Sequence, residues 1–538
     1  MLYMRLKKVL YWGMGCLLML LASLTQAGEA EFIAHEQALI KAEFEQKEQI
    51  MAAWYAADTQ QAVDLMELML ASQLYYHKKE KRLYKVIDAS TGAVADRLID
   101  GEPVTITKKR DFKRVSINNY LRTLFLQDIA KAGLTAAEPE QRIAAAEAIV
   151  GNTDPDLMAT VAGLRAQETN ADVQLAFELV LAVANLQSAD ASQQLAAIET
   201  LGDSLQPAAL NALKEFLASN PESDLAPIAN KAVDSINGKI DFYNGVETLY
   251  FGLSLGSVLV LAGIGLAITF GVMGVINMAH GELIMIGAYT TYVIQLLMPN
   301  HIGWSLLVAV PAAFVVSGLV GILLERGVIR FLYGRPLETL LATFGISLIL
   351  QQAVRSIFSP LNRSVETPSW MSGLIEINPL LSLTQSRMYI IVFCLLIFFL
   401  LLAIMKRTRL GLQVRAVSQN RNMARAMGVR SEWVDALTFG LGSGVAGIAG
   451  VALSQLTNVG PNMGQAYIID SFMVVVFGGV GNLWGTLVAG LSLGVANKLL
   501  EPWAGAVLAK ILVLIFIILF IQKRPRGLFP QRGRAAED

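Results

Sequence analysis

The sequence predicts an all-α protein in which a mostly helical soluble domain precedes a polytopic bundle of about nine membrane helices. Three observations predict this class. Of the 538 residues, 54% are hydrophobic and only 16% are charged, whereas an ordinary soluble domain has about 25% charged residues. Long apolar segments follow one another only after residue 245. The chain before that point is rich in Ala, Leu, Gln and Glu and has no long uncharged run.

Charge and residue counts exclude several classes of function. The 43 Lys and Arg residues against 44 Asp and Glu residues give a formal net charge of −1, so we expect no nucleic-acid partner. Two cysteines and four widely separated histidines predict no disulfide scaffold and no metal site. The sequence also lacks the GxxxxGK[ST] loop that holds ATP phosphates. We therefore expect no cofactor, no catalytic residues and no enzyme activity in this chain.

Residues 1–27 have the pattern of a secretory signal peptide. Arg5, Lys7 and Lys8 precede an apolar stretch from about Trp12 to Leu24, and small residues end at Ala27. This stretch is shorter than the roughly 20 residues that a spanning helix needs. An uncleaved signal anchor is the alternative. In either case the chain after Ala27 is expected to lie outside the cytoplasmic membrane.

Residues 28–240 are predicted to form the soluble helical domain, which contains an internal repeat. The segment 143–149 aligns with 195–201, and the same alignment places Pro155 over Pro207. Apolar positions at helical spacing, followed by a proline turn and a second helix, are typical of a HEAT-like array of helical hairpins. Chance similarity of two Ala-rich helices is the alternative. Stacked hairpins offer an extended surface for a partner.

A β-hairpin is expected within this domain at residues 82–97, where the sequence alternates and turns. Many basic residues surround the hairpin. They could contact anionic lipid headgroups or an acidic partner, and a solvated face is the alternative interpretation. These residues are His77, Lys78, Lys79, Lys81, Arg82, Lys85, Lys108, Lys109, Arg110, Lys113 and Arg114.

The membrane domain is expected from residue 241 to residue 530, with a tail at 531–538. Its apolar segments are 249–271, 272–297, 303–324, 337–359, 388–405, 433–457, 468–500 and 507–521. Basic residues concentrate in 325–336, in 406–430 and after 521, which places these parts in the cytoplasm by the positive-inside rule. An external N-terminal domain and an internal C-terminus require an odd number of crossings. Segment 468–500 is therefore expected to split at its glycine-rich interruption, giving nine crossings or eight plus a re-entrant hairpin.

Polar residues inside apolar segments are the candidates for a substrate pathway, because they are costly within a bilayer. Three groups stand out: Asn277, His280 and Glu282, then Gln351 and Gln352 with Arg355, and then Asp470 with Ser471. The first three residues and the two glutamines are the candidates for the pathway. Their side chains could hydrogen-bond a polar solute that has shed water. Alternatively, His280 and Glu282 lock a broken helix against its neighbours.

Glycine pairs four residues apart also recur in the membrane domain, as at Gly252 and Gly256, Gly440 and Gly444, and Gly481 and Gly485. Such pairs let helix backbones approach closely. Helix packing is therefore the expected role of each pair.

The cytoplasmic loop 406–432 contains a predicted amphipathic helix over residues 410–429. The helix carries basic and small residues and ends near Gly428. Its Ala424 and Met427 side could insert into a groove on a partner protein. An ordinary positively charged loop is the alternative.

Residues 249–530 resemble the permeases of ABC importers of the branched-chain amino-acid type. The matching stretches are 263–289, 335–351, 411–429, 474–490 and the sequence RPRGLFP at 524–530. In that family the loop matching 411–429 is the coupling helix that receives the ATPase stroke. The resemblance therefore implies ATPase coupling at Arg415, Asn420, Ala424, Met427 and Gly428.

The resemblance further implies a permease subunit in a bacterial cytoplasmic membrane that works by alternating access. Its implied partners are membrane lipid, a second related permease, two ATPase subunits and a periplasmic solute-binding protein. A secreted helical extension before the permease domain is similar to that of the urea-type permeases. Urea is therefore the expected substrate. Branched-chain amino acids or another small amide are the first alternative, and a passive channel for small polar solutes is the second.

Overall fold

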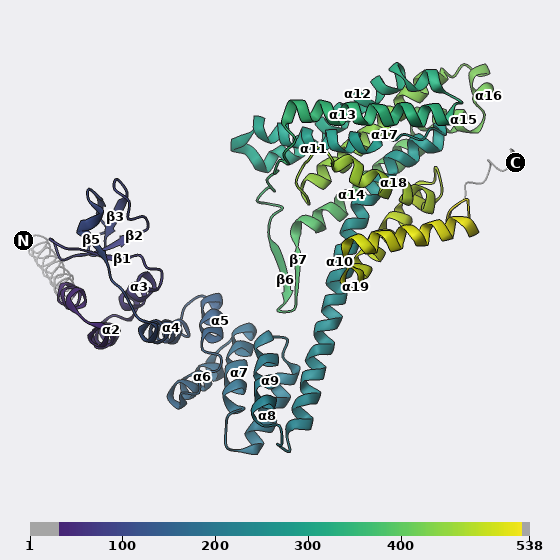
Figure 1. Ribbon diagram of the computed structural model, residues 1–538. Coiled ribbons are helices and arrows are strands. Elements are labelled where there is room, and N and C mark those ends of the chain that lie inside the picture. Colours follow the sequence, from purple (N-terminus) through teal and green to yellow (C-terminus); the bar gives the residue numbers. More distant parts are fainter. Residues whose placement is uncertain (1–31, 530–538) are drawn as a thin grey trace, which may run out of the picture. The chain divides into compact units, whose positions relative to one another are not determined.

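The computed structural model describes residues 32–529. The chain divides into two compact units, and the boundary in the sequence falls between Asn237 and Gly238 (Figure 1). Each unit has hydrophobic clusters of its own. The predicted signal peptide at 1–27 and the tail at 531–538 lie outside the described residues. The predicted boundary at residue 240 falls close to the observed one, within helix α10 (Ala226–Met273).

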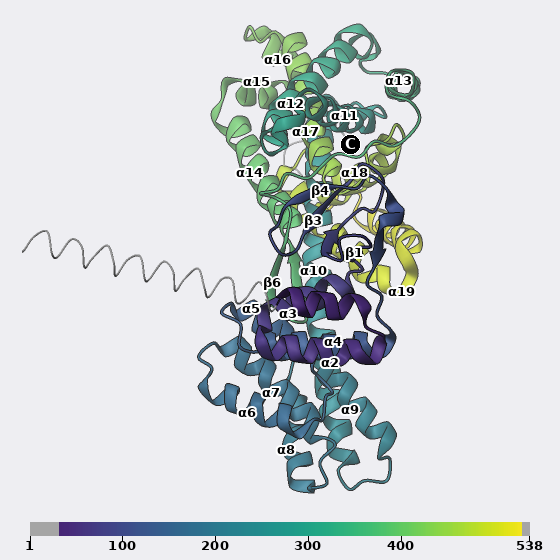
Figure 2. The same ribbon diagram turned by 90° about the vertical axis from the view of Figure 1, so that its left-hand side faces the viewer.

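The first unit begins with a helical stretch at 32–41, followed by α2 (Phe44–Ala57), α3 (Thr59–Leu70) and, after the sheet, α4 (Asn119–Gly133). Figure 2 shows α2, α3 and α4 side by side. The side chains of Trp54, Met66 and Phe125 are buried between them. The Asp58 side chain caps α3 by accepting a hydrogen bond from the Gln61 backbone N–H at 3.1 Å.

A five-stranded antiparallel sheet lies between α3 and α4 in the chain. Its strands are β1 (Leu74–His77), β2 (Leu83–Val86), β3 (Val94–Arg97), β4 (Pro103–Thr105) and β5 (Phe112–Arg114), in the order β4-β3-β2-β1-β5. A short 3-10 turn, Lys109–Asp111, precedes β5. The predicted hairpin at 82–97 is confirmed, because β2 pairs with β3. The sheet is larger than the small β-hairpin that the sequence predicts in a mostly helical domain, because β1, β4 and β5 belong to it as well.

Helices α5 (Pro139–Ala148), α6 (Pro155–Gln167), α7 (Ala171–Asn185), α8 (Ala191–Asp203) and α9 (Pro207–Ser219) follow. The two aligned prolines each occupy the first residue of a helix, α6 and α9, where the missing N–H costs nothing. Two helix pairs, α5 with α6 and α8 with α9, therefore follow the predicted repeat. The HEAT-like assignment stays a prediction.

The second unit contains the apolar helices. They are α10, α11 (His280–Leu297), α12 (Ile302–Gly327), α13 (Pro336–Phe358), α14 (Gln385–Arg407), α17 (Ser431–Ser454), α18 (Met463–Gly478) and α19 (Leu483–Lys523). Smaller elements connect them: the 3-10 turns Pro299–His301 and Ile329–Leu332, the hairpin β6 (Leu374–Asn378) and β7 (Leu381–Thr384), and helices α15 (Arg409–Gln419) and α16 (Arg421–Ala426).

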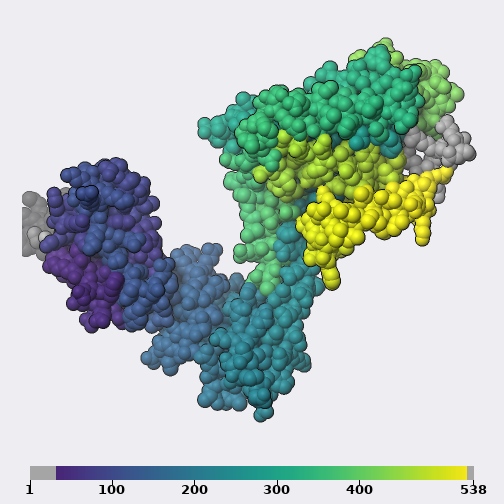
Figure 3. Space-filling view, viewed as in Figure 1, coloured from purple at the N-terminus to yellow at the C-terminus, as the bar shows by residue number. Residues whose placement is uncertain are grey.

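Six helices within the described residues are long and apolar enough to cross a membrane: α10, α12, α13, α14, α17 and α19. This confirms a mostly helical, membrane-spanning second part. Helix α17 lies at its centre and packs against α11 and α12. Helix α19 has an exposed apolar face, which forms part of the surface in Figure 3 (yellow).

Two breaks in the apolar segments bear on the predictions. The predicted split of 468–500 is confirmed, because α18 ends at Gly478 and α19 begins at Leu483. Between them Gly479 and Gly481 have φ of 100° and 79°, a left-handed backbone that favours glycine. The predicted helix at 272–297 is wrong in its first part, since residues 274–279 are not helical and α11 begins only at His280.

Candidate functional site

Helix α11 begins in the interior of the second unit. The ring atom Nε2 of His280, its first residue, lies 2.9 Å from the carbonyl oxygen of Ala262. Ala262 precedes the end of α10 by eleven residues, a rise of about 16 Å along a helix. The non-helical segment 274–279 therefore runs at depth in the bundle. Such backbone is tolerated in a membrane only where protein surrounds it or where it lines a cavity.

The first turn of α18 meets the first turn of α11. A Cβ atom on Gly281 would lie 2.2 Å from the Gly464 carbonyl oxygen, and one on Gly464 would lie 2.6 Å from the Gly281 carbonyl carbon. Two helix N-termini, each with a partial positive charge, thus come together within the bundle. The same dipeptide, Asn-Met, occurs at both places: at 277–278, just before α11, and at 462–463, where α18 begins.

Glu282 lies at this meeting point and is buried. One carboxylate oxygen, Oε1, accepts hydrogen bonds from the Ser347 hydroxyl at 2.9 Å and the Gln351 amide at 2.7 Å. The other oxygen, Oε2, has no hydrogen-bond partner in residues 32–529. A carboxylate can accept about four hydrogen bonds, so Glu282 keeps accepting capacity for a further donor.

The partners of Glu282 belong to a polar stripe along α13. Its members recur every four residues, which places them on one face of the helix: Thr339, Thr343, Ser347, Gln351 and Arg355. The Thr343 hydroxyl accepts a hydrogen bond from the Met278 N–H at 3.2 Å, and Arg355 donates to the Asn462 side chain at 2.7 Å. We call this stripe, with Glu282 and Asn462, the polar seam.

The polar loop 406–432 forms two helices rather than the single helix predicted at 410–429. The break is at Asn420, whose side chain caps α16 by accepting a hydrogen bond from the Met423 N–H at 2.9 Å. Ala424 is only 5% exposed and packs with Val414 and Val417. The expected common face of Ala424 and Met427 therefore does not exist, because Ala424 points into the loop's own core.

The exposed apolar surface of this loop consists of other side chains. Met423 is 61% and Met427 is 79% exposed, and Leu412 is exposed as well. Arg415 lies on α15, also exposed, and its Nε donates to the Gly411 carbonyl at 3.3 Å. Gly428 ends α16 with φ of 87°, a conformation that most L-residues avoid. Methionine side chains are adaptable and are favoured at protein-binding surfaces.

An ion pair and a hydrogen bond from charged side chains hold α16 against α17. The guanidinium of Arg421 pairs with the Asp435 carboxylate and also lies over the Tyr333 ring, 4.1 Å from its centre. Arg425 donates a hydrogen bond from Nε to the Ser431 hydroxyl at 2.6 Å. Asp435 and Ser431 belong to α17, so these bonds connect α16 to the central helix of the second unit.

Comparison with known proteins agrees with this arrangement. Residues 248–521, just over half of the chain, match the family described as branched-chain amino acid transport system / permease component. The chain belongs to this permease family. The match confirms the resemblance at the level of the family, and it begins after the N-terminal helical unit.

Curated relatives of this permease support the same assignment. It is 30% identical over 294 residues to the high-affinity branched-chain amino acid transport system permease protein LivH of Escherichia coli (strain K12), covering 53% of this chain and 94% of that protein. It is 30% identical over 303 residues to BraD of Pseudomonas aeruginosa (54% and 96%), and 25% identical over 290 residues to a probable LivH of Methanocaldococcus jannaschii (51% and 88%). No solved structure matches the chain.

The permease structure brings together four of the five residues predicted for a substrate pathway. Asn277, His280, Glu282 and Gln351 are buried around the start of α11. Gln352 is exposed, because neighbouring residues on a helix point about 100° apart. His280 bonds the carbonyl of Ala262, which fits the alternative role of locking a broken helix.

Sequence reasoning missed Thr343, Ser347 and Asn462 as parts of the same group. Serine and threonine are common in membrane helices, where their hydroxyls bond to the preceding turn, so single residues of this kind carry little signal. Two patterns would have found them. One is the four-residue spacing from Thr339 to Arg355, and the other is the repeated Asn-Met at the start of α11 and of α18.

Proposed function

We propose that the chain is a permease subunit of an ATP-driven ABC importer that moves a small polar solute by alternating access. The polar seam is the observation that carries this proposal. It places a buried carboxylate with a free oxygen, hydroxyls and an amide where the N-termini of α11 and α18 meet. Discontinuous helices that meet near the middle of a bundle are a common way to build a solute site in transporters.

The loop 406–432 couples ATP hydrolysis in a partner subunit to the helix that carries the solute site. Met423 and Met427 form the exposed surface for an ATPase subunit, and Arg421 and Arg425 hold α16 on α17. Helix α17 in turn touches α11 at backbone distance, at Gly447 and Gly287. A movement of the loop therefore reaches the first turn of α11, which carries Glu282. The solute biases this movement through different contacts in the two states.

The importer needs partners that supply what this chain lacks. We propose two ATPase subunits, a second related permease that completes the passage, and a periplasmic solute-binding protein that delivers the solute. The relatives are named as permease proteins of a transport system, which supports an assembly of several subunits. Ala424 and Gly428 then shape the coupling surface, and Arg415 and Asn420 flank it.

We propose urea as the solute, because a helical unit precedes the permease domain in this chain and because the seam suits a small amide. The oxygens of Glu282 and Gln351 accept hydrogen bonds from amide N–H groups. Branched-chain amino acids are the second candidate, and the names of the relatives favour them. A passive channel is the third candidate, but a channel would give no function to the loop 406–432 and its bonds to α17.

Nine crossings follow from the helices if both halves of α19 cross. The helix is interrupted at Gly505, where φ is 76° and ψ is 160°. Helices α10, α11, α12, α13, α14, α17 and α18, with the two halves of α19, make nine segments in the described part of the chain. An odd number puts the N-terminal unit and the C-terminus on opposite sides of the membrane. The basic residues after residue 521 then assign the C-terminus to the cytoplasm and the N-terminal unit to the periplasm of a bacterial inner membrane.

Cysteine labelling tests this orientation. We expect a membrane-impermeant maleimide to label Leu361→Cys and Val94→Cys in cells with a permeabilised outer membrane, because both positions are exposed and are placed outside. Met427→Cys should react only after the inner membrane is opened. The unchanged protein, which carries Cys16 and the buried Cys394, gives the background. Labelling of Met427→Cys from outside would overturn the orientation.

Substitution at two adjacent glutamines tests the seam as the solute route. Gln351→Leu removes a donor to Glu282, and we expect it to lower the uptake rate about tenfold, since a hydrogen bond to a charged group contributes about 1.5–3 kcal/mol. Gln352→Leu has the same size change on the exposed side and should leave uptake unchanged. Equal uptake by both variants, at equal amounts of folded protein, would assign the seam to packing alone.

A further inference from the structure

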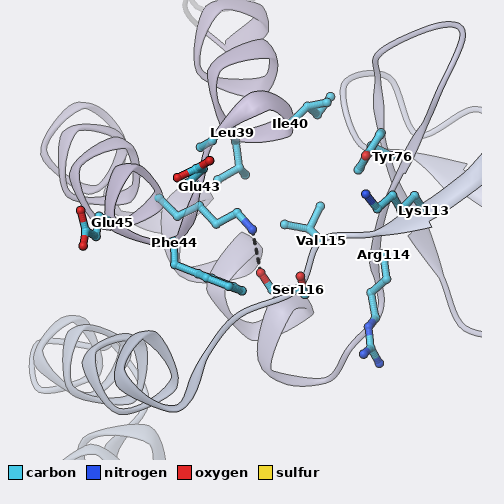
Figure 4. A pocket seen from close by; sticks show the side chains of 12 residues that line it. Leu39, Ile40, Glu43, Phe44, Glu45, Tyr76, Lys113, Arg114, Val115 and Ser116 are labelled. Carbon is cyan, nitrogen blue, oxygen red and sulfur yellow. Dashed lines mark hydrogen bonds between the residues drawn. The ribbon is translucent and has the colours of Figure 1, made fainter.

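A cavity of about 530 Å³ lies in the N-terminal unit, far along the chain from the permease family match. It is formed where the end of the first helical stretch and the start of α2 face β1 and β5 (Figure 4). Its volume lies within the usual range of small-molecule sites, about 300–1,000 Å³. No function discussed above uses it.

The ammonium group of Lys47 is buried in the wall of this cavity. The residue is only 7% exposed, and its Nζ donates one hydrogen bond, at 2.7 Å, to the Ser116 carbonyl. An ammonium group has three donors, and no carboxylate within residues 32–529 lies close enough to pair with it. Burying an unpaired charge is costly, so this arrangement suits an anion that enters from solvent.

Two further cations face the same cavity from the edge strand β5. Lys113 and Arg114 line it, and neither makes an ion pair in the described part of the chain. Burial lowers the pKa of Lys47, and the positive charge of Lys113 lowers it further. Lys113 thus repels Lys47 as long as no anion lies between them. Figure 4 shows Glu45 pointing away from Lys113 and Arg114, on the far side of Phe44.

The rest of the wall is mixed: Glu43, Glu45, Tyr76 and Ser116 line it together with apolar side chains. Leu39 and Val115 are buried core residues, and Ile40 lies beside them. The Phe44 ring lies 5.0 Å from the Lys47 ammonium. An occupant beside Lys47 therefore meets both positive charge and hydrocarbon, which suits an organic anion better than a bare inorganic ion.

We propose that this cavity binds a small organic anion with one carboxylate group and a short hydrocarbon chain. The carboxylate contacts Lys47 and Lys113, and Arg114 adds positive charge at the edge of the cavity. The hydrocarbon part contacts Leu39, Ile40 and Val115. The site is separate from the permease pathway, so the N-terminal unit is a ligand-binding module in its own right, whichever solute the permease moves.

Calorimetric titration of the full-length protein in nanodiscs tests this site. The probe is 3-methylbutanoate, and its amide, 3-methylbutanamide, is the neutral control of the same shape. We expect the acid to bind in the millimolar range, as suits a ligand of about seven heavy atoms, and the amide not to bind. Lys47→Met should weaken binding of the acid about tenfold. Lys79→Met, which removes an exposed lysine outside the cavity, should not change it.

A second variant tests the same site in case Lys47→Met alters the fold. The exposed pair Lys113→Met/Arg114→Met is expected to fold and to bind the acid more weakly than the unchanged protein. Equal binding of acid and amide, no binding of the acid, or binding that neither variant weakens would each overturn the proposal. A loss of binding to a partner protein in Lys47→Met, without binding of the acid, would also overturn it.

Discussion

The double substitution Met423→Glu/Met427→Glu is expected to reduce ATP-driven uptake to the background level. Both side chains are exposed on a loop that lies, in our assignment, outside the lipid and on the cytoplasmic side. Two carboxylates in an apolar docking surface must be desolvated without partners when the ATPase binds. Neither side chain belongs to the loop's core, so the permease itself should fold as before. Uptake and ATPase co-purification are the measurements.

A matched substitution on the opposite side controls for charge alone. Leu361 is also an exposed apolar residue, but it lies in the segment assigned to the periplasm. Leu361→Glu should leave ATPase binding unchanged. If the double methionine variant transports normally, or if both variants lose ATPase binding equally, the loop is not the coupling surface.

Gly287→Val is expected to prevent accumulation of the folded permease. A Cβ atom at Gly287 would lie 2.0 Å from the Gly447 carbonyl oxygen. The overlap is with backbone, so no side chain can move away to relieve it, and α11 would have to separate from α17. Overpacking of this kind costs at least about 3 kcal/mol. We expect the variant to elute as aggregate in fluorescence-detected size-exclusion chromatography.

A glycine on a neighbouring helix provides the control. No atom lies within 4 Å of a Cβ atom built at Gly345 on α13, so Gly345→Val should elute as the unchanged protein does. A monodisperse Gly287→Val protein with an unchanged melting temperature would contradict the close packing of α11 on α17.

The membrane segments were predictable from the sequence because hydropathy acts over a whole helix. The predicted segments 303–324 and 337–359 correspond to α12 and α13. The break at 274–279 was not predictable in this way. Its residues are mostly apolar and include no proline, and the bonds that hold the segment come from distant helices, such as Thr343 to Met278.

The candidate site was partly predictable for a similar reason. Charged and amide side chains such as Glu282 and Gln351 stand out in an apolar segment, because burial without partners is costly there. Their true partner set depends on which helix faces which. Gln351 and Gln352 are equivalent in composition, and only the fold shows that Gln351 reaches Glu282. Likewise, only the fold shows that Ala424 packs inward while Met427 stays exposed.

Uptake by reconstituted proteoliposomes tests the central claim most directly. The vesicles hold this permease with its second permease, ATPase subunits and solute-binding protein, and receive labelled urea or labelled leucine with and without internal ATP. Our account predicts uptake of urea that requires ATP and falls in Gln351→Leu. Leucine uptake that requires ATP would keep the importer and replace the substrate. Solute flux that is indifferent to ATP would contradict the importer and indicate a channel.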